Sequence, residues 1–105
     1  MKRPRKLLKN ILKKIDNLLN LTTFEKKVYK ALLFIPEGEV KSYEWLAKKI
    51  GNPKAARAVG NALNKNPFPG IIPCHRIIRK DGSIGGFAKG TALKKKLLAR
   101  EGLRI

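Results

Sequence analysis

The segment Gly51-Asn52-Pro53 separates two short helical patterns and restricts how they can be joined. Before it, Ser42 can cap a helix from Tyr43 to Ile50, and the glycine can end that helix in a left-handed conformation. The asparagine and proline match the cap and first position of a helix from Pro53 to Asn64. Two short helices joined by such a turn predict a helix-turn-helix.

The second of these helices carries little bulk. Its small residues leave Arg57 as the one long side chain in its middle; they are Ala55, Ala56, Ala58, Gly60 and Ala62. A helix that reads the major groove usually carries several long polar side chains. A bare helix suits either close approach to a narrow groove with one inserted arginine, or tight packing on other helices. Both uses are compatible if they occupy opposite faces.

Helical patterns also lie on both sides of this motif. Apolar residues recur at three- and four-residue spacing from Lys6 to Asn20, which predicts an amphipathic helix. Thr22 and Thr23 before Glu25 resemble a capping box at the start of a second helix, and Thr91 can cap a last helix that Gly102 ends. The residues expected to face inward are Phe24, Val28, Leu32, Leu33, Trp45, Leu46, Ile50, Leu93, Leu97 and Leu98.

Extended segments are short. We expect one at residues 40–42 and a hairpin turn around Asp81-Gly82. The chain is therefore predicted to be mainly α with a small β element. Residues 1–22 would form a basic arm and the amphipathic helix, and residues 23–105 a single folded domain.

The narrow apolar stripe of the first helix has three possible uses. The helix can dock on the domain core, bind a partner, or lie on a membrane surface. Docking is favoured, because a chain of 105 residues needs the extra buried area.

Composition excludes several protein classes. A single cysteine excludes an internal disulfide framework, and one cysteine with one histidine cannot make a four-ligand structural zinc site. No apolar run approaches the ~20 residues that span a bilayer, and lysines interrupt the leucines near the N-terminus, unlike in a signal peptide. We therefore expect a soluble, cytoplasmic protein without a bound metal or cofactor.

The charge favours a polyanionic partner. Twenty-five lysines and arginines against seven acidic residues give a formal net charge of +18. Such an excess drives nucleic-acid binding through counterion release. A thermophile's lysine-rich surface is the competing explanation, supported by the absence of glutamine but not by the scarcity of glutamate. A membrane surface or a ribosome is a further alternative.

The single cysteine, Cys74, lies directly before the single histidine, His75, and Arg76 follows. A thiol beside an imidazole and a guanidinium can be held partly as the nucleophilic thiolate. The isoleucine pairs 71–72 and 77–78 would bury the stretch. The alternative is that a lone cysteine acts only as a small buried hydrophobe.

Several short motifs occur in a specific order and spacing. They are Gly38-Glu39-Val40 with Ser42-Tyr43, the segment Gly51 to Gly60, Asn66-Pro67, Ile72-Pro73-Cys74-His75-Arg76, and Leu97 to Gly102. From Phe24 to Gly102 the chain thereby resembles the catalytic C-terminal domain of the O6-alkylguanine-DNA alkyltransferases, the methylated-DNA–protein-cysteine methyltransferases. The resemblance implies a winged-helix-like helix-turn-helix domain.

The resemblance also implies an activity. Such a protein repairs DNA by irreversible S_N2 transfer of the alkyl group of O6-alkylguanine, chiefly O6-methylguanine, to its own cysteine. The target base must first be flipped out of the duplex, here through the minor groove. The product is a thioether, so each molecule would act once. The implied partner is double-stranded DNA containing O6-alkylguanine, bound by a monomer in the cytoplasm, or at the nucleoid in a prokaryote.

Residue roles follow from the same resemblance. Cys74 would be the nucleophile, and His75, oriented by Glu101, would take its proton through a water molecule. Tyr43 would donate a proton to the guanine, and Asn66 would be the hinge between the helix-turn-helix and the active-site strand. The implied DNA-binding residues are Arg57, the wedge that fills the vacated stack, with Ser42, Ala55, Ala56, Ala58 and Gly60. The implied base pocket consists of Pro69, Phe87, Ala88 and Lys89.

The chain departs from the family pattern in three places. Only the basic arm and amphipathic helix precede Phe24, where the family usually has an N-terminal domain. Phe87 stands where tyrosine is frequent, and Lys89 where glycine is common. These departures concern substrate range and rate rather than the class of reaction.

Two other functions are weighed against alkyl transfer. An alkyltransferase-like protein binds the lesion without chemistry and typically has tryptophan at the cysteine position, so Cys74 argues against it. A helix-turn-helix regulator explains the charge and the helices, but not residues 73–76 or the bare second helix.

Overall fold

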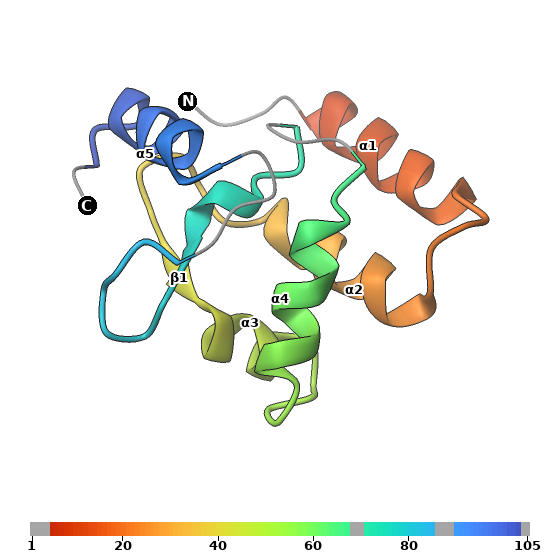
Figure 1. Ribbon diagram of the computed structural model, residues 1–105. Helices are drawn as coiled ribbons and strands as arrows, with labels where there is room; N and C mark the ends of the chain where they lie inside the picture. Colours follow the sequence, from red (N-terminus) through yellow and green to blue (C-terminus); the bar gives the residue numbers. More distant parts are fainter. Residues whose placement is uncertain (1–4, 68–70, 86–89, 104–105) are drawn as a thin grey trace.

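The computed structural model describes residues 5–67, 71–85 and 90–103, and side chains from Leu7 onward. These residues form helices around a two-stranded sheet (Figure 1), which confirms the mainly α prediction with a small β element. The elements are α1 (Arg5–Asn17), α2 (Thr23–Leu32), β1 (Lys41–Ser42), α3 (Tyr43–Lys49), α4 (Ala56–Asn64), the 3-10 turn η1 (Cys74–Arg76), β2 (Ile77–Ile78) and α5 (Thr91–Arg100).

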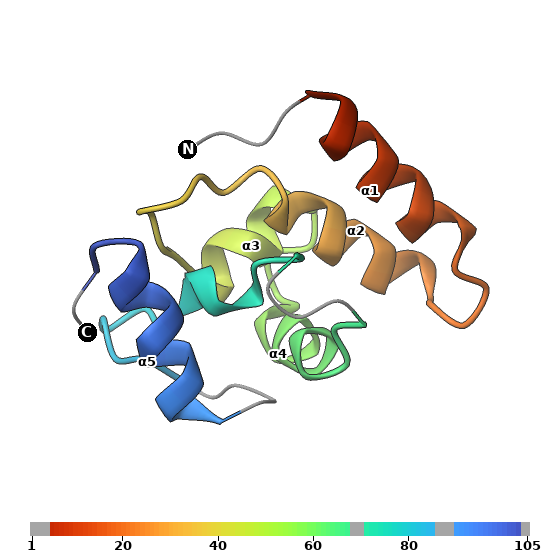
Figure 2. The same ribbon diagram turned by 90° about the horizontal axis from the view of Figure 1, so that it is seen from above.

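The amphipathic helix α1 packs along α2 (Figure 2). Its stripe places Ile11 and Ile15 in the core, so docking is the use that the structure supports. Asp16 ties the two helices together, because its carboxylate pairs with Lys30 and its carbonyl accepts a bond from Lys26 at 2.8 Å. The predicted extension to residue 20 is wrong. The helix ends at Asn17 because the chain must turn back there into α2.

The capping box at the start of α2 is confirmed. The backbone N–H of Glu25 donates to Thr22 Oγ1 at 3.0 Å, and the backbone N–H of Thr22 donates to Glu25 Oε1 at 2.9 Å. Behind this cap, Val28 and Leu32 are buried, as predicted, together with Tyr29. The Tyr29 hydroxyl donates to the carbonyl of Ala62 in α4 at 2.6 Å. Helix α2 is thus held to α4 by a buried hydrogen bond as well as by apolar packing.

The sheet consists of one parallel pair, with Lys41 opposite Ile77 and Ser42 opposite Ile78. Residues 71–76 are not extended strand, because Cys74 to Arg76 form a 3-10 turn before the strand begins. A turn is present at Asp81-Gly82, where Gly82 donates its N–H to the Arg79 carbonyl at 2.9 Å. The predicted hairpin is wrong, because β2 pairs in parallel with β1 and no strand follows the turn among the described residues. The pairing of β1 with β2 brings the start of α3 beside the Cys74 turn.

Helices α3 and α4 form the predicted helix-turn-helix. Ser42 caps α3, since its Oγ accepts the Trp45 N–H at 3.0 Å, and Gly51 has a left-handed φ of 82°. The predicted start of α4 at Pro53 is wrong. The Asn52 carbonyl instead accepts the Ala55 N–H at 3.0 Å, which makes a separate turn before the helix begins at Ala56.

The inward face of α5 also differs from the prediction. Leu98 is buried, but Leu93 is 38% exposed and Lys94 is only 1% exposed. Thr91 is the first helical residue rather than the cap, because the cap position is Gly90, which offers no side-chain bond. The helix is therefore rotated so that Lys94 points into the protein.

Within the part of the chain that the structure describes, no helix combines the length and the apolarity that crossing a membrane requires.

The capping box predicts a stability difference between two neighbouring threonines. Thr22→Ala removes the side-chain acceptor of the Glu25 N–H and should lower the free energy of unfolding by about 1 kcal/mol, measured by urea denaturation. The control is Thr23→Ala, which removes an exposed hydroxyl and should cost less than about 0.5 kcal/mol. Equal losses in the two variants would contradict a capping role for Thr22.

Candidate active site

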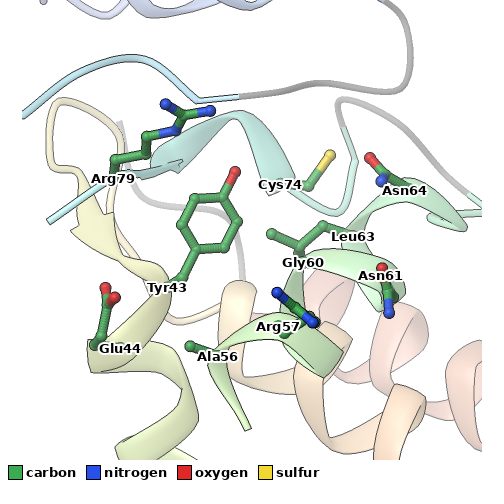
Figure 3. A pocket seen from close by; sticks show the side chains of 10 residues that line it. All are labelled: Tyr43, Glu44, Ala56, Arg57, Gly60, Asn61, Leu63, Asn64, Cys74 and Arg79. Carbon is green, nitrogen blue, oxygen red and sulfur yellow. The ribbon is translucent and has the colours of Figure 1, made fainter.

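A cavity of about 500 Å³ opens between the helix-turn-helix and the Cys74 turn (Figure 3). Its lining comes from α3, α4, η1 and the segment after β2, and consists of Tyr43, Glu44, Ala56, Arg57, Gly60, Asn61, Leu63, Asn64, Cys74 and Arg79. The cavity is thus built from segments that are far apart in the sequence and that the β1–β2 pairing brings together.

Cys74 lies in this cavity with its thiol held by the chain that follows α4. The residue is 4% exposed. Asn66 Nδ2 donates to Cys74 Sγ at 3.1 Å and to the Ile72 carbonyl at 2.8 Å, so one amide fixes both the sulfur and the approach to the turn. Burial raises the pKa of the Cys74 thiol, while the Asn66 bond and the charge of Lys94 oppose that rise. The resting group is therefore a buried thiol with two neighbours that favour its ionised form.

His75 and Glu101 form a buried pair next to the thiol. His75 Nε2 lies 2.7 Å from Glu101 Oε2, and the side chains are 3% and 6% exposed. Burial lowers the pKa of His75, whereas the hydrogen bond to Glu101 and its negative charge act to raise that pKa. Burial has the larger effect, so the ring is neutral at neutral pH. A neutral ring that bonds a carboxylate through Nε2 carries its proton there. Nδ1, which has no hydrogen-bond partner among the described residues, is then free to accept a proton.

The Glu101 carboxylate also accepts hydrogen bonds from Arg76 and from a backbone N–H. Arg76 Nε donates to Oε1 at 2.9 Å, Arg76 Nη2 to Oε2 at 3.0 Å, and the Gly38 N–H to Oε1 at 3.2 Å. Burial alone would raise the pKa of Glu101, but the bonds from Arg76, His75 and Gly38 outweigh it and lower the pKa to about 2. Arg76 further donates to the Ile35 carbonyl at 2.8 Å, so it also links the Cys74 turn to the segment after α2.

Tyr43 faces the thiol from the first turn of α3, with the Arg79 side chain beside its hydroxyl (Figure 3). Burial raises the pKa of Tyr43, and the Arg79 charge opposes that rise, so the phenol keeps its proton. Gly85 approaches the hydroxyl so closely that a Cβ there would lie 2.9 Å from Tyr43 Oη, and its φ is +71°. Both the close approach and the positive φ therefore require glycine at position 85. The uncharged Tyr43 hydroxyl remains in the cavity as a hydrogen-bond donor.

Helix α4 has one face packed on the core and one face exposed. Val59 is buried against the core, while Arg57 and Ala58 are exposed. Ala56 and Gly60 line the cavity, and Ala55 precedes the helix in a half-buried position. One face thus packs and the opposite face is bare.

The remaining predicted residues divide into two groups. The Ser42 hydroxyl is used as the cap of α3. The proposed base-pocket residues Pro69, Phe87, Ala88 and Lys89 lie outside the described residues. No group of three or more metal-binding side chains occurs among the residues that the structure describes.

Two cationic residues near the thiol and phenol were missed from sequence. Lys94 lies 5.9 Å from the centroid of the Tyr43 ring, and Arg79 lines the cavity. A signal for Lys94 was available, because it is four residues before the buried Leu98 and so shares its helical face. Arg79 follows β2 in a turn, where no periodicity marks its direction.

Comparisons with known proteins agree with this architecture. The model of the family "6-O-methylguanine DNA methyltransferase, DNA binding domain" matches residues 23–103. The chain is 52% identical over 81 residues to the methylated-DNA–protein-cysteine methyltransferase of Methanosarcina acetivorans, covering 77% of this chain and 52% of that protein. The chain spans about half the length of the curated Methanosarcina relatives that it matches.

Solved structures include proteins bound to DNA. The Mycobacterium tuberculosis OGT in complex with DNA matches with a TM-score of 0.77 and 47% identity, covering 79% of this chain and 51% of that one. S. pombe Atl1, in complex with damaged DNA containing O6-carboxymethylguanine, matches with a TM-score of 0.71 and 35% identity. The match covers 83% of this chain and 82% of that one.

The paired Glu101 carboxylate predicts how stability depends on pH. Its pKa is about 2 in the fold against 4.5 ordinarily, so its contribution is present above pH 4.5 and is lost as the pH falls toward 2. The free energy of unfolding should drop by about 3 kcal/mol over that window from this group alone. Glu101→Gln should remove this part of the slope, measured by urea denaturation at a series of pH values.

The matched control for this prediction is Glu39→Gln, which neutralises an exposed carboxylate and should keep the wild-type slope. A Glu101→Gln variant that loses stability as steeply as the wild type below pH 4.5 would show that other groups cause the acid dependence.

Proposed function

The chain belongs to the 6-O-methylguanine DNA methyltransferase family, and from that premise we propose that it repairs DNA by taking the alkyl group of O6-alkylguanine onto Cys74. The observation that carries the proposal is the thiol itself, in a cavity shared with a phenol and an exposed arginine, Tyr43 and Arg57. The substrate would be double-stranded DNA containing O6-methylguanine, bound by a monomer. The chain spans about half the length of the Methanosarcina relatives that it matches, so the activity of the whole protein is itself part of the proposal.

The reaction is a single displacement. The Cys74 thiolate attacks the methyl carbon, the S–C bond forms as the O6–C bond breaks, and the bonding pair stays with the guanine. Tyr43, which its surroundings keep protonated, donates its proton to the base as that charge develops. The net change moves the methyl group to sulfur and the thiol proton to guanine. Because a thioether is not regenerated by hydrolysis, each molecule acts once.

His75 and Glu101 are proposed to remove the thiol proton. Nε2 of the ring faces the carboxylate at 2.7 Å, so Nδ1 is the basic nitrogen and would accept the proton through a water molecule. The imidazolium that forms would be stabilised by Glu101, which stays ionised at neutral pH because its pKa is about 2. Asn66 would hold the sulfur as the hinge between α4 and the turn, since its amide bonds Sγ at 3.1 Å.

Helix α4 is the proposed DNA-binding element. The methyl group of the lesion lies inside the duplex, whereas Cys74 is 4% exposed in its cavity, so the base must leave the stack to reach it. Arg57, exposed on α4 at the cavity, would fill the vacated stack. The small residues around it would allow the helix to approach the minor groove closely. The net charge of +18 would add sequence-independent attraction to phosphates.

One second function is supported by a specific observation. The structural similarity to S. pombe Atl1, solved with an O6-carboxymethylguanine lesion, covers 83% of this chain and supports lesion binding as the second candidate function. The intact thiol and its pairing with Asn66 favour transfer over binding alone. Both functions share the same DNA surface and differ in whether sulfur is alkylated.

The transfer itself can be tested by mass. Incubation with a duplex containing O6-methylguanine should convert the Cys74 peptide completely to its S-methyl form, detected by mass spectrometry after digestion. Unmodified duplex, and a Cys74→Ser variant with the lesion duplex, should give no adduct. Tight lesion binding without an adduct would favour the lesion-binding function, and no preference for the lesion would contradict both.

The wedge role of Arg57 predicts a substrate-dependent defect. Arg57→Ala should slow transfer from duplex DNA about tenfold or more, because the flipped state loses its stabilisation, and should change transfer from free O6-benzylguanine by less than about twofold. The comparison is of single-turnover rates on the two substrates. Lys27→Ala, which removes an exposed charge from α2, should leave both rates near the wild type. Equal loss on both substrates would contradict base flipping by Arg57.

A further inference from the structure

Arg79 is an exposed cation at the cavity that the proposed transfer does not yet use. It follows β2 and lines the cavity together with Tyr43, Cys74 and Arg57. In Figure 3 the Tyr43 ring lies between the side chains of Arg79 and Arg57. The cavity therefore carries one arginine from α4 and a second arginine from a different segment of the chain.

The turn after β2 fixes the direction of Arg79. Its backbone N–H donates to the Ser83 carbonyl at 3.0 Å, and its carbonyl accepts the Gly82 N–H at 2.9 Å. The stem of the side chain packs beside the phenol, because a Cβ built at Gly85 would lie 3.5 Å from Arg79 Cγ and 2.9 Å from Tyr43 Oη. A bonded backbone and a packed stem thus place the charged end of Arg79 at the cavity, next to the phenol hydroxyl (Figure 3).

The guanidinium has no acceptor in the part of the chain that the structure describes, since no hydrogen bond or ion pair there involves its nitrogens. The Asp81 carboxylate lies near enough for the charge of Arg79 to act on it, but it bonds to the N–H and the hydroxyl of Ser83 instead. Glu44 also lines the cavity, yet its buried Oε1 has no hydrogen-bond partner among the described residues. The donors of Arg79 are therefore available to a ligand.

The ligand expected at this position is a backbone phosphate. Cys74 is only 4% exposed, so a flipped base must enter the cavity deeply to reach it. The phosphates on either side of that nucleotide are charged, and burying them with the base would be costly, so they stay at the opening. A planar guanidinium binds a phosphate through two parallel N–H bonds. Arg79 presents such a group at the opening.

Building on the proposed transfer, we propose that Arg79 binds a backbone phosphate of the flipped nucleotide and so holds that nucleotide in the cavity. The two arginines then act on different parts of the DNA. Arg57 fills the space that the base leaves, and Arg79 fixes the strand beside the base. An effect of Arg79 on the Tyr43 hydroxyl is the alternative, but the charge of Arg79 is exposed and water screens it.

Two substrates separate these roles. Arg79→Met keeps an unbranched side chain and removes the charge. It should lower the second-order rate of single-turnover transfer from the lesion duplex about tenfold, because a charge-assisted bond to phosphate is lost. Transfer from free O6-benzylguanine, which has no phosphate, should change by less than about twofold. Equal losses on both substrates would overturn the proposal, because they would assign the effect to Tyr43 or to the fold.

The phosphate itself is tested by removing its charge. A methylphosphonate, which is a neutral analogue of phosphate, replaces in turn each phosphate next to the O6-methylguanine nucleotide. Binding is measured by fluorescence anisotropy in a Cys74→Ser background. At one position the methylphosphonate should weaken binding about tenfold, and it should weaken binding by the Arg79→Met variant of that background less than about twofold. The same penalty in both proteins at every position would overturn the proposal.

The matched control is Arg100→Met, which makes the same substitution at an exposed residue of α5 outside the cavity lining. It should leave the transfer rates and the methylphosphonate penalty unchanged. Loss of the penalty in Arg100→Met as well would overturn the proposal, because the phosphate contact would not be specific to Arg79. Arg79→Lys keeps a cation without the paired donors and should retain part of the penalty.

Failure of this proposal and failure of the proposed function give different results. The binding measurement uses a protein without the Cys74 thiol, so it does not depend on transfer. A penalty that requires Arg79, with no methyl adduct on the wild type, would contradict the transfer alone. A methyl adduct, with a penalty that is independent of Arg79, would contradict the role of Arg79 alone.

Discussion

The arrangement of the site depends on the hydrogen bonds and ion pairs of the Glu101 carboxylate. This carboxylate lies just after α5. It accepts hydrogen bonds from His75 and Arg76 of the Cys74 turn and from the N–H of Gly38 in the segment before β1. Three segments distant in sequence thereby converge on two oxygen atoms. A buried carboxylate is tolerated only when such donors compensate its lost hydration. The turn that carries the thiol is therefore positioned by this ionic cluster as well as by the pairing of β2 with β1.

Two different sets of groups surround the sulfur. On the side of His75, the imidazole shares its proton with a carboxylate that is ionised at neutral pH. On the side of the cavity, the sulfur meets the Asn66 amide and faces the charge of Lys94. In the proposed reaction, proton acceptance and stabilisation of the thiolate would therefore fall to different groups. Such a division lets each group keep the protonation state that its task requires.

Features set by neighbours in sequence could be predicted, and features set by distant contacts could not. The Thr22–Glu25 capping box, the Ser42 cap and the left-handed Gly51 depend on residues within a few positions, and all three are present. The start of α4 was misplaced because Asn52 makes a backbone turn that its side-chain preference does not reveal. Lys94 is an intermediate case. Its position one turn before Leu98 indicated a buried face, but its contact with the Tyr43 ring involves a segment far away in the sequence.

For the candidate site, the residue types were predictable from the family resemblance, but their geometry was not. No local pattern could tell that Arg79 lines the cavity or that Gly85 approaches Tyr43 too closely for any side chain. These relationships arise only when the parallel pairing of β1 and β2 sets the two segments beside each other. Physical chemistry then determines which charges the site can hold.

The buried bond from the Tyr29 hydroxyl to the Ala62 carbonyl, 2.6 Å long, has a consequence for how α4 can evolve. Small side chains bury little area, so packing alone restrains the tilt of such a helix weakly. The phenol restrains it from the rear, at the end away from Ala56 where the helix begins. The angle of the helix then depends little on its outer surface, so substitutions of its exposed residues should leave that angle unchanged.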